Sequence, residues 1–257
     1  MKWARANTAD GRTLTGVVKD DQFHPRSSLG SDETAGDPVS LIDVTLLPPV
    51  VPGKFIGLWN NFKAAAEKNG NEHPAHPLYF FKADTSLSGH RAVVEMPVSA
   101  GRVIFEGELG IVIGKTCKNA TVEEAEQAIF GYTCVNDFTS LDILFADPSF
   151  PQWTRSKSFD GFGNVGPVIE TDVAWQDLIV TVLVNGRERQ SYPAADMILP
   201  PAEIVRLLSQ DMTLNPGDLI ACGTSLGARP VKAGMEVEVV IDGIGTLGTT
   251  LVDPAGA

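Results

Sequence analysis

Residues 105–115 read FEGELGIVIGK, with Glu106 and Glu108 directly before an apolar run. The run from Glu108 to Gly114 is short, rich in β-branched residues and bounded by glycine, which predicts a strand. Three further runs have the same character, at residues 178–184, 218–222 and 236–241. The pattern therefore predicts that strands are the main elements of the fold.

Helical patterns are fewer. Three helices are expected. The first covers residues 60–69, the second begins at a capping box formed by Thr121 and Glu124 and continues to Phe130, and the third covers residues 202–209. Because these helices do not alternate regularly with the strands, a Rossmann or barrel layout is disfavoured. We expect a mainly β protein of the α+β class, arranged as a sandwich or roll with a few peripheral helices.

The first 47 residues differ from the rest: they are polar and turn-rich, with short strand-like pieces at 13–18 and 40–44. The sequence LPPVVPG follows at 47–53 and predicts a linker, because proline fixes φ and glycine frees it. We therefore expect a small β-rich N-terminal region at 1–47, a linker at 48–53 and a main domain at 54–257.

The charge balance narrows the function classes. The 257 residues include 20 Lys and Arg against 32 Asp and Glu, a net charge of −12. Nucleic acid is disfavoured as a partner, because its binders need a dense basic face. The longest apolar runs have only the length of strands, and the N-terminus lacks the apolar segment of a signal peptide. We expect no membrane segment and a cytoplasmic location, and the acidity suits a cation site.

Two glycine motifs match known signatures without their context. Gly161 to Gly166 fits G-x-G-x-x-G, but a strand-like run follows it instead of the helix that a dinucleotide site needs. Gly223 to Gly227 fits G-x-S-x-G, but the last histidine is His90, so the triad order of that hydrolase fold is impossible. We expect a glycine-rich turn at the first motif and no nucleophile elbow at the second.

Three carboxylates are the best candidates for chemistry. Glu106 and Glu108 stand two residues apart, so on a strand they face the same side. Asp137 ends another strand-like run, residues 132–136. Such a set without Cys or His suits a hard cation such as Mg²⁺ or Mn²⁺. The spacing alone leaves open whether Asp137 meets the glutamates, and whether they form only an exposed acidic strand end.

The chain resembles the fumarylacetoacetate hydrolase family over about residues 50–252. The matching segments occur in the family's order at 51–58, 105–115, 131–137, 157–162, 184–190, 213–224 and 243–247. The resemblance implies a mixed β-sandwich roll as the catalytic domain at 54–257, usually as a homodimer. It also implies that Glu106, Glu108 and Asp137 hold the divalent metal.

The resemblance further implies a small-molecule substrate, a short 2-oxo or 2,4-dioxo acid. Its carboxylate and 2-oxo oxygen would chelate the metal, which would then stabilise an enolate. Lys157 matches the active-site lysine of the family, which supports the developing negative charge. Thr224, next to Gly223, matches a threonine that contacts the substrate carboxylate.

The departures from the family pattern concern proton transfer and specificity. Lys63 takes the place of a histidine that, with a glutamate, activates water; Ala66 takes the place of that glutamate. Leu141 and Leu144 replace an arginine and a glutamine. Lys63 is therefore a second catalytic candidate. Further candidates for lid groups are Glu67, His73 and His76.

Three functions stay open at this stage. The leading one is cleavage of a C–C bond in catabolism, by a hydrolase of the acylpyruvate type or a decarboxylase. The alternative is an isomerase of the 2-hydroxyhepta-2,4-diene-1,7-dioate type, in the 5-carboxymethyl-2-hydroxymuconate pathway of aromatic catabolism, which needs the same enolate and no activated water. The third is a family member that binds a ligand without catalysis.

Overall fold

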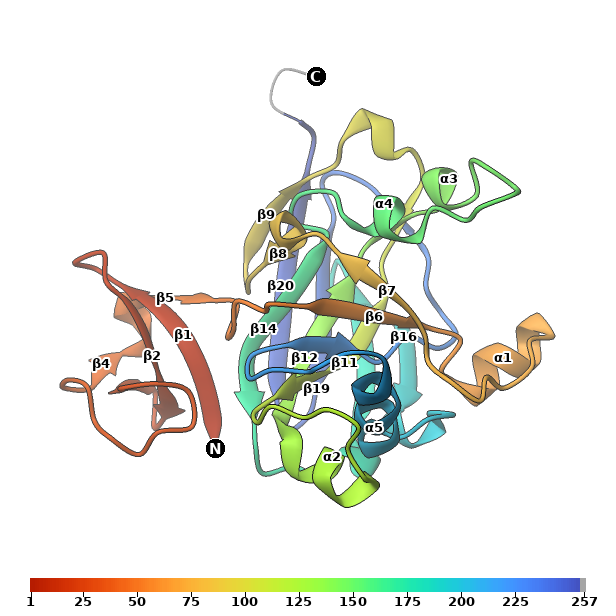
Figure 1. Ribbon diagram of the computed structural model, residues 1–257. Coiled ribbons are helices and arrows are strands. Elements are labelled where there is room, and N and C mark those ends of the chain that lie inside the picture. The colour runs from red at the N-terminus through yellow and green to blue at the C-terminus, as the bar shows by residue number, and fades with distance from the viewer. Residues whose placement is uncertain (255–257) are drawn as a thin grey trace.

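The structure is a computed structural model that describes residues 1–254. Its helices are short and lie at the periphery: α1 Lys63–Asn69, α2 Val122–Ala128, α3 Leu141–Leu144, α4 Trp153–Lys157 and α5 Pro201–Asp211. Strands make up most of the remaining regular structure (Figure 1). The predicted class, mainly β with a few peripheral helices, is confirmed.

The strands of the N-terminal part are β1 Lys2–Thr8, β2 Thr13–Lys19, β3 Gln22–Arg26, β4 Val39–Ser40 and β5 Val44–Leu47. Those of the middle part are β6 Phe55–Trp59, β7 Leu78–Lys82, β8 Leu87–Ser88, β9 Ala92–Glu95, β10 Val103–Ile104, β11 Gly107–Ile113, β12 Ile129–Asp137 and β13 Thr139–Ser140. Those of the last part are β14 Gly163–Glu170, β15 Ile179–Val184, β16 Arg187–Pro193, β17 Leu219–Ala221, β18 Pro230–Val231, β19 Glu236–Ile241 and β20 Gly245–Val252.

β11 is the central strand of the body. It pairs antiparallel with β12 on one side and with β17 on the other, inside a sheet whose order within residues 1–254 is β4-β3-β2-β1-β14-β12-β11-β17-β6-β7. Every residue of β11 is buried, which is why its sequence is a nearly continuous apolar run. The predicted strand at 108–114 is thus confirmed, shifted by one residue.

A second sheet packs against the first, in the order β16-β15-β19-β20-β9. β15 and β19 alternate between buried and less buried residues, and their buried side chains share one apolar core with Leu109 and Ile111 of β11. This packing of one sheet on another forms the sandwich that the sequence pattern predicted.

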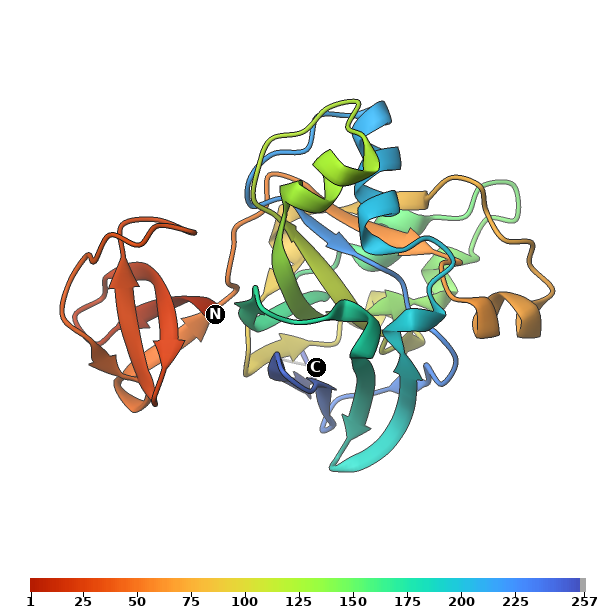
Figure 2. The ribbon, with the colours of Figure 1, turned by 90° about the horizontal axis from the view of Figure 1, so that it is seen from below.

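The N-terminal strands lie to one side of the body in two views at right angles (Figures 1 and 2). They are nevertheless joined to it, because β1 pairs with β14 through Lys2 and Trp3. The predicted boundaries fall between β5 and β6, and residues 255–257 of the predicted main domain lie outside the described residues. The linker at 48–53 has no strand, but Val50 is buried in a cluster with Trp3 and Val112, which fixes it to the body.

Some boundaries differ from the prediction for local reasons. The predicted strand at 40–44 is interrupted by a 3-10 turn at Leu41–Asp43. The helix predicted at 60–69 begins only at Lys63, because Asn60 has a left-handed φ of 58° and Phe62 is extended. The capping box at Thr121 is confirmed, but its helix ends at Ala128, where β12 takes over the chain. The helix predicted at 202–209 is confirmed as α5.

The two rejected glycine motifs lie in the structure as expected. Gly161 to Gly166 runs into the strand β14, and no helix follows Gly223 to Gly227 before β18.

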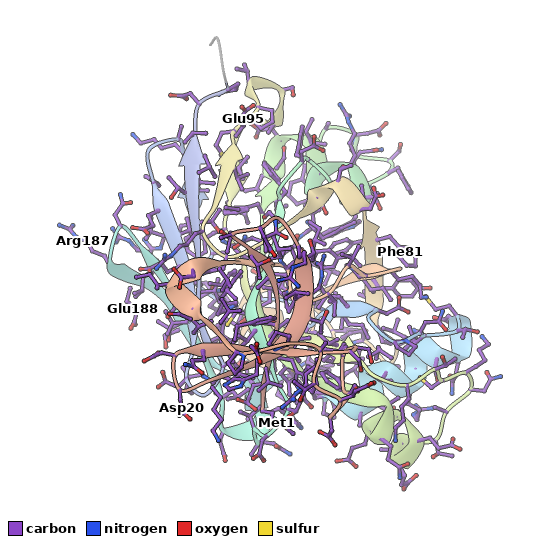
Figure 3. All side chains as sticks on the ribbon, turned by 90° about the vertical axis from the view of Figure 1, so that its left-hand side faces the viewer. Met1, Asp20, Phe81, Glu95, Arg187 and Glu188 are labelled. Atoms are coloured by element: carbon purple, nitrogen blue, oxygen red, sulfur yellow. The ribbon has the colours of Figure 1, made fainter. Side chains whose placement is uncertain are left out.

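Within residues 1–254, no helix is both long and apolar enough to cross a bilayer. Figure 3 shows the rim of the molecule, with Phe81 of β7 on one side and Arg187 and Glu188 of the β15–β16 hairpin on the other.

Candidate active site

Glu106 and Glu108 flank Gly107 at the start of β11, and the pleat turns both carboxylates to one face. The opposite face packs on the second sheet, and a Cβ on Gly107 would lie only 2.2 Å from Cγ2 of Val182. The residue between the two glutamates must therefore be small, because the strand is pressed against the core on its other side.

Gly107→Ala is expected to lower the free energy of unfolding by about 1–3 kcal/mol, the usual cost of overpacking a filled core. Gly248→Ala is the matched control, since its Cβ would meet only Cε1 of His90, at 3.9 Å. Urea unfolding of both variants measures the effect. Equal stability of the two variants would contradict the close packing behind Gly107.

Asp137 reaches the glutamates because β12 pairs with β11 in a register that sets Asn136 opposite Gly107. The Asp137 amide donates to the Glu106 carbonyl at 2.9 Å. Carboxylate oxygens of Glu106, Glu108 and Asp137 lie within 4.8 Å of one another. The question that spacing left open is answered: the three carboxylates form one cluster.

Two lysines contact this cluster. Lys157 Nζ lies 2.5 Å from Glu106 Oε2 and 2.5 Å from Asp137 Oδ2. Lys82 Nζ lies 2.5 Å from the other oxygen of Asp137 and also donates to the backbone carbonyls of Lys157 and Phe162. Both lysines are buried, so Asp137 has an ammonium group on each of its oxygens.

Burial and charge shift the ionisation of these groups in opposite directions. Burial, together with Asp137 and Glu106, raises the pKa of Glu108 well above its usual value. Burial would also raise the pKa of Asp137, but Lys157 and Lys82 outweigh it and lower that pKa. Burial disfavours the charged form of Lys157, yet Asp137, Glu106 and Glu108 prevail and raise its pKa. For Lys82, burial prevails and lowers the pKa, against the attraction of Asp137.

The donor set fits a divalent cation. The three carboxylates outnumber the two lysines, and Glu108 is buried beside both other carboxylates, which is unfavourable unless a positive charge lies between them. All the donors are oxygen atoms, the ligands that Mg²⁺ and Mn²⁺ prefer. The alternative that these residues form only an exposed acidic strand end is wrong, because Glu108 and Asp137 are buried.

Gly223 and Thr224 lie against the same strand. The Gly223 amide donates to Glu108 Oε2 at 2.8 Å, with a left-handed φ of 90° that favours glycine. The Thr224 hydroxyl donates to the Gly107 carbonyl at 2.9 Å and accepts from Gln190 Nε2 at 2.8 Å. Both residues thus stand beside the carboxylates, and the contact of Thr224 with a substrate carboxylate stays a prediction.

A cavity of 280 Å³ opens onto the carboxylates, at the small end of ligand pockets, which span about 300–1,000 Å³. Trp153 and Lys157, one turn apart on α4, both line it, as does Thr224. A larger cavity of 690 Å³ lies beside the N-terminal strands, with Arg5 and Lys115 in its wall. We assign the chemistry to the smaller of the two, because Glu106 and Glu108 of the carboxylate cluster line it and, among residues 1–254, no carboxylate lines the larger one.

Comparison with known proteins identifies the family. A family model described as fumarylacetoacetate (FAA) hydrolase C-terminal matches residues 54–252. The chain belongs to the fumarylacetoacetate hydrolase family. Several of the similar proteins are named as enzymes, among them an isomerase, a tautomerase and a hydrolase, and this chain is an enzyme of the fumarylacetoacetate hydrolase family.

Three similar proteins illustrate the range of the family. A 5-carboxymethyl-2-hydroxymuconate delta-isomerase from Mycobacterium smegmatis is 33% identical, with a TM-score of 0.90 over 99% of this chain and 100% of its own. Oxaloacetate tautomerase YisK of Bacillus subtilis is 33% identical over 93% of this chain and 86% of its own. Maleylpyruvate hydrolase from Sphingobium sp. SYK-6, solved with manganese(II) and pyruvate, is 28% identical, with a TM-score of 0.79 over 98% of this chain and 99% of its own.

The departures from the family pattern lie on two elements: Leu141 and Leu144 line the cavity, whereas Lys63 does not. Lys63 is exposed on the first turn of α1, which projects from the end of β6 in Figure 1. The residues of α1 that line the cavity are Ala65 and Asn69. The structure thus does not bring Lys63 to the carboxylates, because the helix turns its cavity-lining residues inward and Lys63 outward.

The other lid candidates also lie outside the cavity wall. Glu67 and His73 are exposed to solvent. His76 faces the end of α5, with Nε2 3.7 Å from Asp211 Oδ2. The roles proposed for these groups stay predictions, and this arrangement does not support them.

Lys82 is the site residue that the sequence reasoning missed. It ends the run LYFFK, where a lysine after aromatic residues forms no motif of its own. The alternation of β7 would have found it, because Phe80 and Lys82 lie on the same buried side while Phe81 is exposed. Gln190 likewise lies in a segment that matches the family but had no predicted role, and it connects Thr224 to the Gly107 amide.

Proposed function

We propose that the enzyme forms an enolate from a short 2-oxo acid and completes the reaction by moving a proton, as a tautomerase or isomerase does. The observation that carries this proposal is the set of ionisable residues in the cavity wall. Among the described residues, these are Glu106, Glu108 and Lys157. Enolate formation needs one group that takes the C3 proton and returns it, and the carboxylates of Glu106 and Glu108 are the acceptors that the wall supplies. Hydrolysis needs in addition a base that makes a water molecule reactive, and among the described residues of the wall neither a histidine nor a further carboxylate is present.

The residues have separate roles in this proposal. Glu106, Glu108 and Asp137 would hold a divalent metal, which when bound supplies a Lewis acid that polarises the 2-oxo group. Lys157 keeps its proton, because the carboxylates raise its pKa. Two of its three N–H groups are used by Glu106 and Asp137, so the third can donate to a developing enolate oxygen.

Carbon–carbon cleavage is the second candidate. It is supported by the likeness to maleylpyruvate hydrolase, whose structure contains manganese(II) and pyruvate. It requires either a water molecule that attacks a carbonyl or loss of carbon dioxide. The first needs a base that the cavity wall does not offer, while the second needs only the enolate-stabilising groups already described.

Hydrogen–deuterium exchange at C3 of 2-oxopentanoate tests the proposal. In D₂O with Mg²⁺ or Mn²⁺, NMR is expected to show enzyme-catalysed exchange that stops with EDTA. Release of pyruvate from 2,4-dioxopentanoate and from oxaloacetate is measured in parallel and is expected to stay at background. Pyruvate release faster than exchange would establish cleavage instead, and absence of exchange would overturn the proposal. Assembly as a homodimer and the cytoplasmic location stay predictions.

A further inference from the structure

The cavity has two chemically different ends. Its inner end holds the charged residues, which are Glu106, Glu108 and Lys157. The rest of the wall is mostly apolar, and Trp59, Phe145 and Leu226 are its exposed apolar residues, at the mouth of the cavity. Leu141 and Leu144 line the same wall, with the neutral amide of Asn69. The division implies that a substrate with its 2-oxo acid group at the inner end turns its other end to apolar side chains.

Two short helices, α3 and α4, contribute Leu141, Leu144 and Trp153 to the apolar part of the wall. Leu141 and Leu144 lie three residues apart on α3, so they share one face, and Phe145 follows directly. On the facing side, the ring of Trp153 on α4 lies 5.6 Å from that of Trp59. Phe145 is 66% exposed and Trp59 42% exposed, so large apolar surface remains at the mouth of the cavity.

A second carboxylate on the substrate would have no cationic partner here, and of the nearby amides Asn60 already donates to the Glu72 carbonyl and Asn71 to Asn60 Oδ1. Among the described residues of the wall, the one cation is Lys157, and it already contacts Glu106 and Asp137 at 2.5 Å. A carboxylate placed against Leu141 and Phe145 would lose part of its hydration without gaining an ion pair, which is unfavourable. An alkyl or aryl group in the same place would gain from burial.

We propose that the substrate is a 2-oxo acid with an uncharged, apolar tail, and that Leu141, Leu144 and Phe145 select this tail. The inference rests on the proposed function for the position of the 2-oxo acid group. The tail lies along α3 and against Trp59, while the acid group lies at the carboxylate cluster. A substrate with a second terminal carboxylate is bound less well.

The test compares two ligands of the same length. 2-Oxopentanoate and 2-oxoglutarate share the 2-oxo acid group and differ only in a terminal methyl or carboxylate. Isothermal titration calorimetry of the Mg²⁺-loaded protein is expected to give a dissociation constant at least about tenfold lower for 2-oxopentanoate. Each methylene added, up to 2-oxooctanoate, is expected to tighten binding by up to about fourfold. Equal or tighter binding of 2-oxoglutarate would overturn the inference.

A variant pair assigns the selectivity to α3. Leu141→Arg is expected to shift the ratio of the two dissociation constants at least about tenfold toward 2-oxoglutarate, because it supplies the missing cation. Val122→Arg, on the exposed side of α2, is the matched control and should leave the ratio unchanged. An unchanged ratio in a folded Leu141→Arg protein would also count against the inference.

The same samples separate this inference from the proposed function. Tighter binding of 2-oxopentanoate without exchange at its C3 would support the inference of an apolar tail and contradict the proposed reaction. Metal-dependent exchange at C3 together with tighter binding of 2-oxoglutarate would support the proposed reaction and contradict the inference of an apolar tail. A protein that binds neither ligand in the presence of Mg²⁺ would overturn both.

Discussion

Glu106→Ala is expected to lower metal-dependent kcat/KM by more than about 100-fold. Loss of a residue that merely hydrogen-bonds to a metal ligand costs up to about 100-fold, and loss of a ligand itself should cost more. The change removes one of three carboxylates that would hold the cation. It also removes one of the two acceptors of the Thr139 hydroxyl, at 2.8 Å, and one of the two side-chain acceptors of Lys157. Affinity for Mn²⁺, measured by electron paramagnetic resonance, is expected to fall together with turnover.

Glu67→Ala is the control for this experiment. Glu67 is an exposed carboxylate on α1 and does not line the cavity, so its loss is expected to leave metal affinity unchanged. If Glu106→Ala keeps both wild-type turnover and wild-type Mn²⁺ affinity, the metal site has been assigned to the wrong residues. Loss of turnover with full affinity would instead give Glu106 a role in the reaction itself.

Lys82→Met is expected to lower the free energy of unfolding by about 3–5 kcal/mol, the cost of removing one partner from a buried ion pair. Lys82 is completely buried beside Asp137, and methionine keeps the length of the side chain without its charge. The change leaves one oxygen of Asp137 without its ammonium group and frees the carbonyls of Lys157 and Phe162. Urea unfolding, monitored by circular dichroism, measures the loss.

Lys63→Met is the matched control, because it makes the same chemical change at an exposed lysine. It is expected to alter the free energy of unfolding by less than about 0.5 kcal/mol. Its turnover should also stay near the wild-type value, since Lys63 does not line the cavity. If turnover instead falls by about 100-fold or more, Lys63 is restored as a proton-transfer group.

The carboxylate cluster could be predicted in part from local geometry. The alternation of a strand is enough to set Glu106 and Glu108 on one face. The approach of Asp137 depends on the register of β11 and β12, which are joined through α2, and residue spacing does not determine that register. Resemblance to a family supplied the missing step, because the matching segments occur together.

The orientation of side chains was harder to predict than their position in the sequence. An alignment without gaps put Lys63 where the family has a histidine, but the direction of its side chain depends on where α1 begins. The left-handed Asn60 delays that start to Lys63. Lys82 was missed for a related reason: a strand ending in lysine is usually solvated, and only pairing with β6 brings it to Asp137.

The two faces of β11 have a consequence for how such enzymes diversify. One face carries Glu106 and Glu108 and the other packs Gly107 against Val182, so a change in this strand affects folding and chemistry together. The wall formed by Leu141 and its neighbours lies on a four-residue helix and loops at the periphery. Leu144 is buried, but Leu141 and Phe145 are at least partly exposed, so mutations at these two can alter substrate preference at little cost in stability. New specificities of this scaffold are therefore expected to arise there while the catalytic strand stays constant.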